Sequence, residues 1–188
     1  NGLIAVKKPV FPFNKFPQQS VFLSPEMKST GEVIGFDTHL GSAYAKAESG
    51  AGQSLPEKGT VFMSVNDSDK MDAIPIARDF KELGFKIEAT GGTALLLSEN
   101  GVETQTIFKV GEGRPNVVDA IKNKEVHLVI NTPLGAQSRY DEYEIGRAAI
   151  RYKVPVITTI SGAQAAVRGI RNTLAGRIKY RSLQEVFG

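Results

Sequence analysis

The chain has 188 residues, 41% of them hydrophobic and 23% charged, which is typical of a globular protein with one domain of ordinary size and a smaller unit. It contains no cysteine, which excludes disulfides and thiolate chemistry, and no apolar run near the ~18 residues of a membrane helix. The net charge of +3 is spread without a run of five like charges, so neither a nucleic acid nor a membrane is expected as a partner. No signal peptide is recognisable, and we expect a cytoplasmic protein. The chain begins Asn-Gly-Leu-Ile without Met, which favours a fragment of a longer protein.

Residues 1–57 differ in composition from the remainder and form the first predicted unit. Prolines and phenylalanines are interspersed there: Pro9, Phe11, Pro12, Phe13, Phe16, Pro17, Phe22 and Pro25. Because proline lacks an N–H and fixes φ, we expect a small irregular segment that packs against another domain. A strand or turn at 29–35, a helix at 40–48 and a linker at 49–54 follow. The second unit is predicted to cover residues 58–188.

In this second unit, short apolar runs alternate with helical patterns. The predicted strands are 61–65, 85–89, 104–108, 126–130 and 155–158, and the predicted helices are 67–83, 93–99, 116–123, 140–152 and 163–174. Asp67 and Ser68 suit the start of the first of these helices, and Pro75 is expected to bend or delay it. Strands that alternate with helices predict an α/β fold, with a five-stranded parallel sheet covered by helices on both faces.

Polar clusters follow the predicted strands at the points where each strand ends. They are Ser64 to Lys70, Thr90-Gly91-Gly92-Thr93, Lys109, Asn131-Thr132 and Thr158 to Gly162. In a parallel sheet these points lie at one edge, where open α/β folds bind their ligands. The pattern therefore predicts a binding platform for a phosphate-bearing molecule.

Each cluster also has a structural interpretation. The glycines of Thr90-Gly91-Gly92-Thr93 and the N–H groups of the following helix suit an anion, but the segment is also a turn that Thr93 could cap. Lys70 and Lys109 supply positive charge to a phosphate or are solvated surface residues, and Asn131 is a strand-end cap or a ligand contact. Ser161-Gly162 fits an anion site or a helix cap, and we favour the cap.

The remaining titratable residues indicate neither a catalytic centre nor a metal site. His39 and His127 lack metal-ligand spacing, and His127, within an apolar strand, is interpreted as structural. The candidate acids form no pair with a catalytic arrangement; they are Asp67, Asp69, Asp72 and Glu112. We predict no catalytic residue in this chain.

Several longer motifs carry a family resemblance that covers essentially the whole chain. They are Phe13-Asn14-Lys15-Phe16, Pro25-Glu26-Met27-Lys28-Ser29-Thr30-Gly31-Glu32-Val33, Ala89-Thr90-Gly91-Gly92-Thr93-Ala94, Glu112-Gly113-Arg114-Pro115 and Ile130-Asn131-Thr132. With these motifs the chain resembles the C-terminal end of the large subunit of carbamoyl phosphate synthetases. The resemblance implies that residues 1–57 are the tail of the second ATP-grasp unit and that residues 58–188 are a methylglyoxal synthase-like allosteric domain with a Rossmann-like or flavodoxin-like sheet.

The resemblance also implies the ligands of this domain. Relatives are controlled by UMP and IMP, and by ornithine at a site nearer the synthetase junction. The family's effector-phosphate contacts fall on Lys70, Thr90, Thr93, Lys109 and Asn131, and Thr132 completes the candidate site. The chain departs from the pattern where relatives continue Asn-Thr-Thr, because Pro133 replaces the second threonine. Gly91 stands where relatives can carry histidine.

For the parent protein, the resemblance implies an ATP-dependent ligase that uses Mg or Mn. It would make carbamoyl phosphate from bicarbonate and glutamine-derived ammonia, for arginine and pyrimidine biosynthesis. Its partners would be a small glutaminase subunit and the upstream domains, and assembly of identical copies is compatible with the sequence. The fragment itself is expected to need no cofactor and to be non-catalytic.

The alternative function is that of a methylglyoxal synthase-type lyase acting on a triose phosphate. Such enzymes need a carboxylate base, and those of this fold carry acidic and His-Asp-Pro-Asp segments after strands three and four. Here these stretches read Gly113-Arg114-Pro115-Asn116 and Ser138-Arg139-Tyr140-Asp141. The sequence keeps the phosphate-binding residues and loses the base, so regulation is favoured. A module that serves oligomerisation alone would leave the strand-end clusters unexplained.

Overall fold

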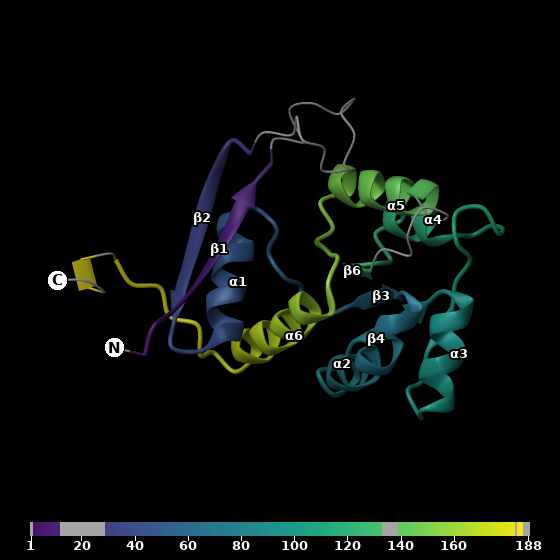
Figure 1. Cartoon of the computed structure of the whole chain (residues 1–188), viewed down its shortest axis with the longest axis horizontal. Coiled ribbons are helices and arrows are strands. Elements are labelled where there is room, and N and C mark those ends of the chain that lie inside the picture. The colour runs from purple at the N-terminus through teal and green to yellow at the C-terminus, as the bar shows by residue number, and fades with distance from the viewer. Residues whose placement is uncertain (1, 12–28, 133–138, 183, 186–188) are drawn as a thin grey trace.

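The computed structural model describes residues 2–11, 29–132, 139–182 and 184–185, and this part of the chain contains two β-sheets (Figure 1). The first sheet is a hairpin of β1 (Ile4–Val10) and β2 (Gly31–Asp37), paired antiparallel from Ile4–Asp37 to Val10–Gly31. Helix α1 (Leu40–Gly50) packs against both strands. At Gly35 an added Cβ would lie 2.1 Å from the carbonyl oxygen of Ala43, so strand and helix meet backbone to backbone.

The described part of the N-terminal unit is more regular than the sequence predicts. β1 is a strand that the sequence did not indicate, although Pro9 lies within it. Both strands of a two-stranded sheet have a free edge, and an edge tolerates the missing N–H of a proline. The predicted strand or turn at 29–35 is β2, and the predicted helix at 40–48 is α1. Residues 12–28, with the remaining prolines, lie outside the described residues.

The second sheet has five parallel strands, which confirms the predicted fold class. They are β3 (Thr60–Ser64), β4 (Lys86–Ala89), β5 (Gln105–Thr106), β6 (Leu128–Asn131) and β7 (Val156–Ile157), in the order β5-β4-β3-β6-β7. The chain builds outward from β3 on one side and then returns to build outward on the other. A crevice at this reversal of strand order is where open α/β sheets bind ligands.

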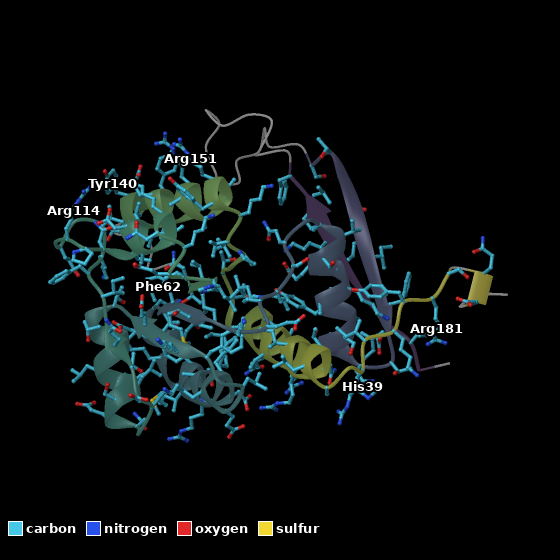
Figure 2. All side chains as sticks on the ribbon, turned by 180° about the vertical axis from the view of Figure 1, so that it is seen from behind. His39, Phe62, Arg114, Tyr140, Arg151 and Arg181 are labelled. Atoms are coloured by element: carbon cyan, nitrogen blue, oxygen red, sulfur yellow. The ribbon has the colours of Figure 1, made fainter. Side chains whose placement is uncertain are left out.

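Helices cover both faces of this sheet. They are the short 3₁₀ helix η1 (Asp67–Asp69) and the α-helices α2 (Lys70–Glu82), α3 (Gly91–Glu99), α4 (Val117–Lys122), α5 (Arg139–Tyr152) and α6 (Ile160–Leu174). Val61 and Met63 of β3 point to the core formed with α2, α3 and α6, whereas Phe62 points to the core formed with α4 and α5. Figure 2 shows Phe62 inside this unit and Tyr140 on its outside. β3 is buried throughout, as a central parallel strand requires.

Most differences from the predicted elements lie at their ends. The strand predicted at 104–108 is reduced to β5, followed by a single bridge from Phe108 to Asn116. α6 begins three residues earlier than predicted because the Thr159 hydroxyl accepts the N–H of Gly162 at 3.1 Å. The helix cap favoured at Ser161-Gly162 is therefore wrong, and Thr159 provides it. α2 runs through Pro75 without a break in its range.

The two units are joined by a close contact between α1 and α6. A Cβ on Gly41 would lie 2.7 Å from the backbone of Arg168 and Gly169, and a Cβ on Gly169 would lie 2.7 Å from the Gly41 carbonyl oxygen. The Asn172 amide donates to the buried Ser42 hydroxyl at 2.9 Å. Residues from the two predicted domains thus share one packed helix pair (Figure 1).

Candidate functional site

The carboxyl ends of β3, β4 and β6 bring buried polar residues from three strands together. The strand register places Ser64 opposite Asn131, and the hydroxyl of Thr90, which follows β4, donates to the Ser64 hydroxyl at 3.3 Å. Ser64, Thr90 and Asn131 are all buried. The predicted meeting of strand-end polar residues at one edge therefore holds for these strands.

Two further threonines of the predicted site hold the loop that follows β3. The Thr93 hydroxyl accepts the N–H of Val65 at 3.3 Å, and the Thr132 hydroxyl accepts the N–H of Asn66 at 2.9 Å. Both side chains are buried. Because a hydroxyl that accepts one bond can still donate another, each threonine positions the loop and keeps a donor.

The segment after β4 presents backbone N–H groups at the start of α3. The helix begins at Gly91 with Thr90 as its N-cap residue, and Thr90 makes no side-chain capping bond. The alternative in which Thr93 caps this helix is therefore wrong. Gly91 and Gly92 are exposed, and no atom of the described residues lies within 4 Å of a Cβ placed on Gly91. The first turn of α3 is thus open to an anion.

Lys70, the first residue of α2, reaches this helix start. Its Nζ lies 3.5 Å from the position of a Cβ on Gly92. The same Nζ forms an ion pair with Asp67 at 2.7 Å, and this hydrogen bond and charge lower the pKa of Asp67. The turn that carries both residues is capped by Asn66, whose side-chain oxygen accepts the N–H of Asp69 at 3.0 Å. Asn66, rather than the predicted Asp67 or Ser68, is the capping residue.

Lys109 lies farther along the same edge, after β5. Its backbone N–H donates to the Glu112 carboxylate at 3.2 Å. Asp141, in the first turn of α5, is close enough that the charges of Lys109 and Glu112 act on its pKa. Burial raises the pKa of Asp141, the charge of Lys109 opposes this, and Glu112 and Glu142 reinforce it. From the sequence, Asp141 was a candidate only for the lyase function; its position at the start of a helix after β6 is the signal that places it at this edge.

The segment between Lys109 and α4 ends in the residue that caps this helix. The Asn116 side chain accepts the N–H groups of Val118 and Asp119 at 3.0 and 3.3 Å, and the Asp119 carboxylate accepts the N–H of Asn116. This reciprocal pair is a capping box. Asn116 therefore has a structural role at the place where lyases of this fold carry an acidic segment. Pro133 lies outside the described residues, so its effect on the site stays a prediction.

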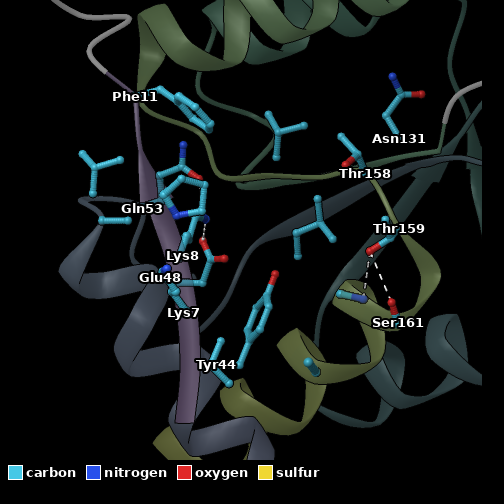
Figure 3. Close-up of a pocket in the computed structure, with 18 of the residues that line it drawn as sticks. Lys7, Lys8, Phe11, Tyr44, Glu48, Gln53, Asn131, Thr158, Thr159 and Ser161 are labelled. Carbon is cyan, nitrogen blue, oxygen red and sulfur yellow. Dashed lines mark hydrogen bonds and ion pairs between the residues drawn. The ribbon is translucent and has the colours of Figure 1, made fainter. Parts of the chain in front are cut away.

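A cavity of about 860 Å³ lies between the N-terminal unit and the β7 side of the sheet (Figure 3). Its walls come from β1 and α1 on one side and from α5, β7 and the start of α6 on the other. Asn131 lines it, as do Tyr44, Glu48 and Thr158. The sequence did not indicate this cavity, because its two walls are distant in sequence and meet only through the packing of α1 on α6.

An ion pair with a buried carboxylate lies at the wall of this cavity. Lys8 of β1 contacts the Glu48 carboxylate of α1, and the Lys8 ammonium also donates to the Gln53 side chain at 3.1 Å. The Glu48 side chain is only 3% exposed. Burial, and then the charge of Glu48, raise the pKa of Tyr44. A buried carboxylate needs such partners to remain charged.

The two histidines lie away from the carboxyl edge. The ring Nδ1 of His127 accepts the N–H of Thr60 at 3.2 Å, at the amino end of β3. Its structural interpretation is confirmed. His39 is exposed and precedes α1.

The comparisons with known proteins identify the sheet unit. Residues 72–158 match the family model described as MGS-like domain. Over these residues the sheet unit is similar to MGS-like domains. The match covers the carboxyl edge from Thr90 to Thr132, while Lys70, the hairpin and α1 precede it. The boundary predicted between residues 57 and 58 stays a prediction.

Relatives extend over nearly the whole chain and confirm the resemblance stated from the motifs. The chain is 50% identical over 182 residues to "Carbamoyl phosphate synthase large chain" of Nostoc sp., covering 97% of this chain and 16% of that protein. It is 52% identical over 183 residues to the protein of that name from Archaeoglobus fulgidus, with 97% and 17% covered. It is 46% identical over 190 residues to "Carbamoyl phosphate synthase large chain, C-terminal section" of Aquifex aeolicus, with 98% and 35% covered. The chain therefore spans a minor part of the length of these relatives. No helix among the described residues is long and apolar enough to span a membrane.

Proposed function

We propose that the MGS-like domain is the allosteric regulatory domain of a carbamoyl phosphate synthase large chain and binds a nucleotide effector such as UMP or IMP. The observation that carries this proposal is the position of the Lys70 ammonium beside Gly92, at the open N-terminus of α3. Helix N-termini and lysine are both suited to a phosphate group, since N–H dipoles and a point charge act on it together.

The phosphate would lie on the first turn of α3. Thr90 and Lys70 would contact it from β4 and α2, and Lys109 would add positive charge from the β5 side. Thr93 and Thr132 support this arrangement by holding the loop after β3, and Asn131 stands between the carboxyl edge and the cavity. The ribose and base would then extend from this edge.

Regulation would follow from a difference in effector affinity between two conformations of the parent protein. An effector shifts such an equilibrium by no more than this difference, typically about 1–3 kcal/mol. The packed pair of α1 and α6 supports a path to the remainder of the protein, because it joins the domain to the N-terminal hairpin.

The parent protein would be a cytoplasmic, ATP-dependent ligase that makes carbamoyl phosphate for arginine and pyrimidine biosynthesis. Its substrates would be bicarbonate and ammonia delivered from glutamine by a small glutaminase subunit. ATP and its Mg or Mn would be bound by upstream parts of the parent, which lie outside this chain. The names of the relatives support this assignment.

Ornithine is the second proposed effector, and the cavity beside α1 is its candidate site. The cavity lies at the junction with the N-terminal unit, and its lining includes the carboxylates of Glu48 and Glu142 and the hydroxyl of Thr158. Carboxylates suit the amino groups of this ligand, and hydroxyls suit its carboxylate.

Calorimetric titration of the chain with UMP, IMP and ornithine tests these proposals. We expect nucleotide binding that is lost in Lys70→Met. Lys86→Met is the matched control, because Lys86 is exposed at the opposite, amino end of β4, and it should bind as the wild type does. Absence of nucleotide binding at millimolar concentration, in the folded chain and in the parent protein, would overturn the nucleotide site.

One observation favours the alternative, lyase function. Asp141 is a carboxylate whose pKa is raised by burial, close to Lys109, as a general base requires. The Asn116 capping box weighs against it, because a helix cap occupies the place of the acidic segment. Release of phosphate from dihydroxyacetone phosphate, abolished by Asp141→Asn, would decide for the lyase.

A further inference from the structure

The cation proposed to hold the effector phosphate already holds a carboxylate. The Lys70 Nζ lies 2.7 Å from Asp67 Oδ1 and 3.5 Å from the position of a Cβ on Gly92. A phosphate on the first turn of α3 would therefore approach the same ammonium group that Asp67 contacts.

Asp67 is the member of this ion pair that can move away from the other. Its side chain is 91% exposed, whereas that of Lys70 is only 27% exposed. A carboxylate at the surface can rotate into water at little cost, while the partly buried lysine stays at the helix start.

The backbone turn does not depend on the Asp67 carboxylate. Asn66 caps the turn, since its side-chain oxygen accepts the hydroxyl of Ser68 at 2.6 Å and the N–H of Asp69 at 3.0 Å. The Asn66 amide also donates to the Asp69 carboxylate at 2.7 Å and to the Thr132 hydroxyl at 3.2 Å. Asp67 therefore contributes its charge at this position, while its neighbours hold the fold.

We propose that Asp67 competes with the effector phosphate: its carboxylate pairs with Lys70 and must be displaced when the ligand binds. This inference rests on the proposed function and adds a residue that sets the affinity of that site. The lowered pKa of Asp67 supports it, because the carboxylate stays ionised and available as a competing anion at neutral pH.

The size of the effect follows from the exposure of the pair. Exposed ion pairs are weak because water screens them, so the competition lowers the affinity for phosphate by no more than about fivefold. The loss of affinity is the same for every ligand whose phosphate binds Lys70, because the Asp67–Lys70 ion pair is broken each time. Asp67 should thus set the effector concentration at which the site fills, without altering the preference among effectors.

The experiment compares Asp67→Asn with the wild type by calorimetric titration with UMP, IMP and inorganic phosphate. We expect binding of all three to tighten by a common factor of about two to five. Asp72→Asn is the matched control: Asp72 is exposed, lies two residues from Lys70 and carries the same charge, but is not its partner in the ion pair. It should change each affinity by a smaller factor. In Lys70→Met, the additional Asp67→Asn change should have no effect.

The outcomes separate this inference from the proposed function. If the wild type binds nucleotide and Asp67→Asn binds it equally or more weakly, the competitor role is overturned and the nucleotide site stands. The competitor role is also overturned if Asp72→Asn tightens binding as much as Asp67→Asn does, since the removal of any nearby negative charge would then explain the effect. If neither protein binds UMP, IMP or phosphate, both proposals fail. Thermal unfolding of each variant shows whether it is folded.

Discussion

Thr93 and Thr132 show that a residue of a proposed binding site can also hold the fold around it. Sequence position alone placed both at the carboxyl edge, because each lies in a polar cluster that follows an apolar strand. Their hydrogen bonds to the N–H groups of Val65 and Asn66 could not be predicted, since these depend on the path of the loop after β3. The proximity of Asp141 to Lys109 could not be predicted for a similar reason, because Asp141 lies in the first turn of α5 and Lys109 follows β5.

Replacement of Thr132 should destabilise the protein even without ligand. In Thr132→Val the side-chain volume is kept and the acceptor for the Asn66 N–H is lost, which costs about 1–3 kcal/mol. Urea unfolding measures this loss of unfolding free energy. Thr106→Val, at an exposed position of β5, is the control and should stay within about 0.5 kcal/mol of the wild type. Equal stability of the two variants would mean that water replaces the hydroxyl.

The pair of Asp37 and Lys46 should make stability depend on pH. Lys46 Nζ lies 2.8 Å from the Asp37 carboxylate, and each side chain is only 14% exposed. Burial acts to raise the pKa of Asp37, but the hydrogen bond and charge of Lys46, together with backbone hydrogen bonds from His39 and Thr38, lower it from its ordinary value of 3.8. A lowered folded-state pKa gives stability that is complete above about pH 3.8 and is lost as the pH falls below it.

The measurement for this pair is the unfolding free energy of Asp37→Asn and of the wild type at pH 7 and near pH 3. We expect Asp37→Asn to be less stable by about 1.5–3 kcal/mol at pH 7, since a hydrogen bond to a charged group is removed. The difference should shrink at low pH, where the wild-type carboxylate becomes protonated. A difference that is constant with pH would contradict the role of this charge.

Among the elements, strands and helices with strong patterns were predicted and their ends were not. β3 and β6 are buried apolar runs whose type the sequence indicates directly. β5 and β7 are edge strands with two paired residues each, so the pairing ends before the apolar pattern does. β1 was not predicted because the proline content around it masks its alternation, and its partner β2 lies beyond residues 12–28.

The crossing of α1 and α6 depends on two glycines. In Gly169→Ala the new methyl group would lie 2.7 Å from the Gly41 carbonyl oxygen, which forces the helices apart. Helix propensity alone would favour alanine, so a net loss of about 1–3 kcal/mol would be a packing effect. Thermal or urea unfolding checks this against Gln164→Ala, an exposed position on the same helix. A stabilised Gly169→Ala would show that the contact can relax.

At the scale of the whole molecule, the parallel sheet could be predicted and the relation between the two units could not. Alternating strands and helices are a local pattern, and their order limits the possible sheets. The cavity and the α1–α6 contact join residues 40–50 to residues 160–174, and nothing local marks that pairing. The candidate site at the carboxyl edge could be predicted from the sequence, because its position depends only on where the strands end.

Removal of residues 1–57 should therefore weaken the MGS-like domain that remains. The change uncovers the face of α6 that α1 covers and one wall of the cavity, so apolar surface is exposed. We expect a Tm lower by about 5–15 °C and increased binding of the dye ANS, while nucleotide binding at the distant α3 edge is retained. Scanning calorimetry measures the Tm, fluorescence measures ANS binding, and calorimetric titration measures nucleotide binding. An unchanged Tm would mean that the N-terminal unit adds no stability.

The glycine contact between α1 and α6 also bears on how the coding sequence of such proteins can be divided. The relative from Aquifex aeolicus that is named a C-terminal section matches 98% of this chain, so the match includes both helices. On one polypeptide the helices meet at a high effective concentration, because the folded sheet that lies between them in the chain holds them near each other. A division between them would turn this pairing into an association of two molecules, with the loss of translational and rotational freedom that association requires. Divisions between the two helices should accordingly be disfavoured, and divisions ahead of the hairpin tolerated.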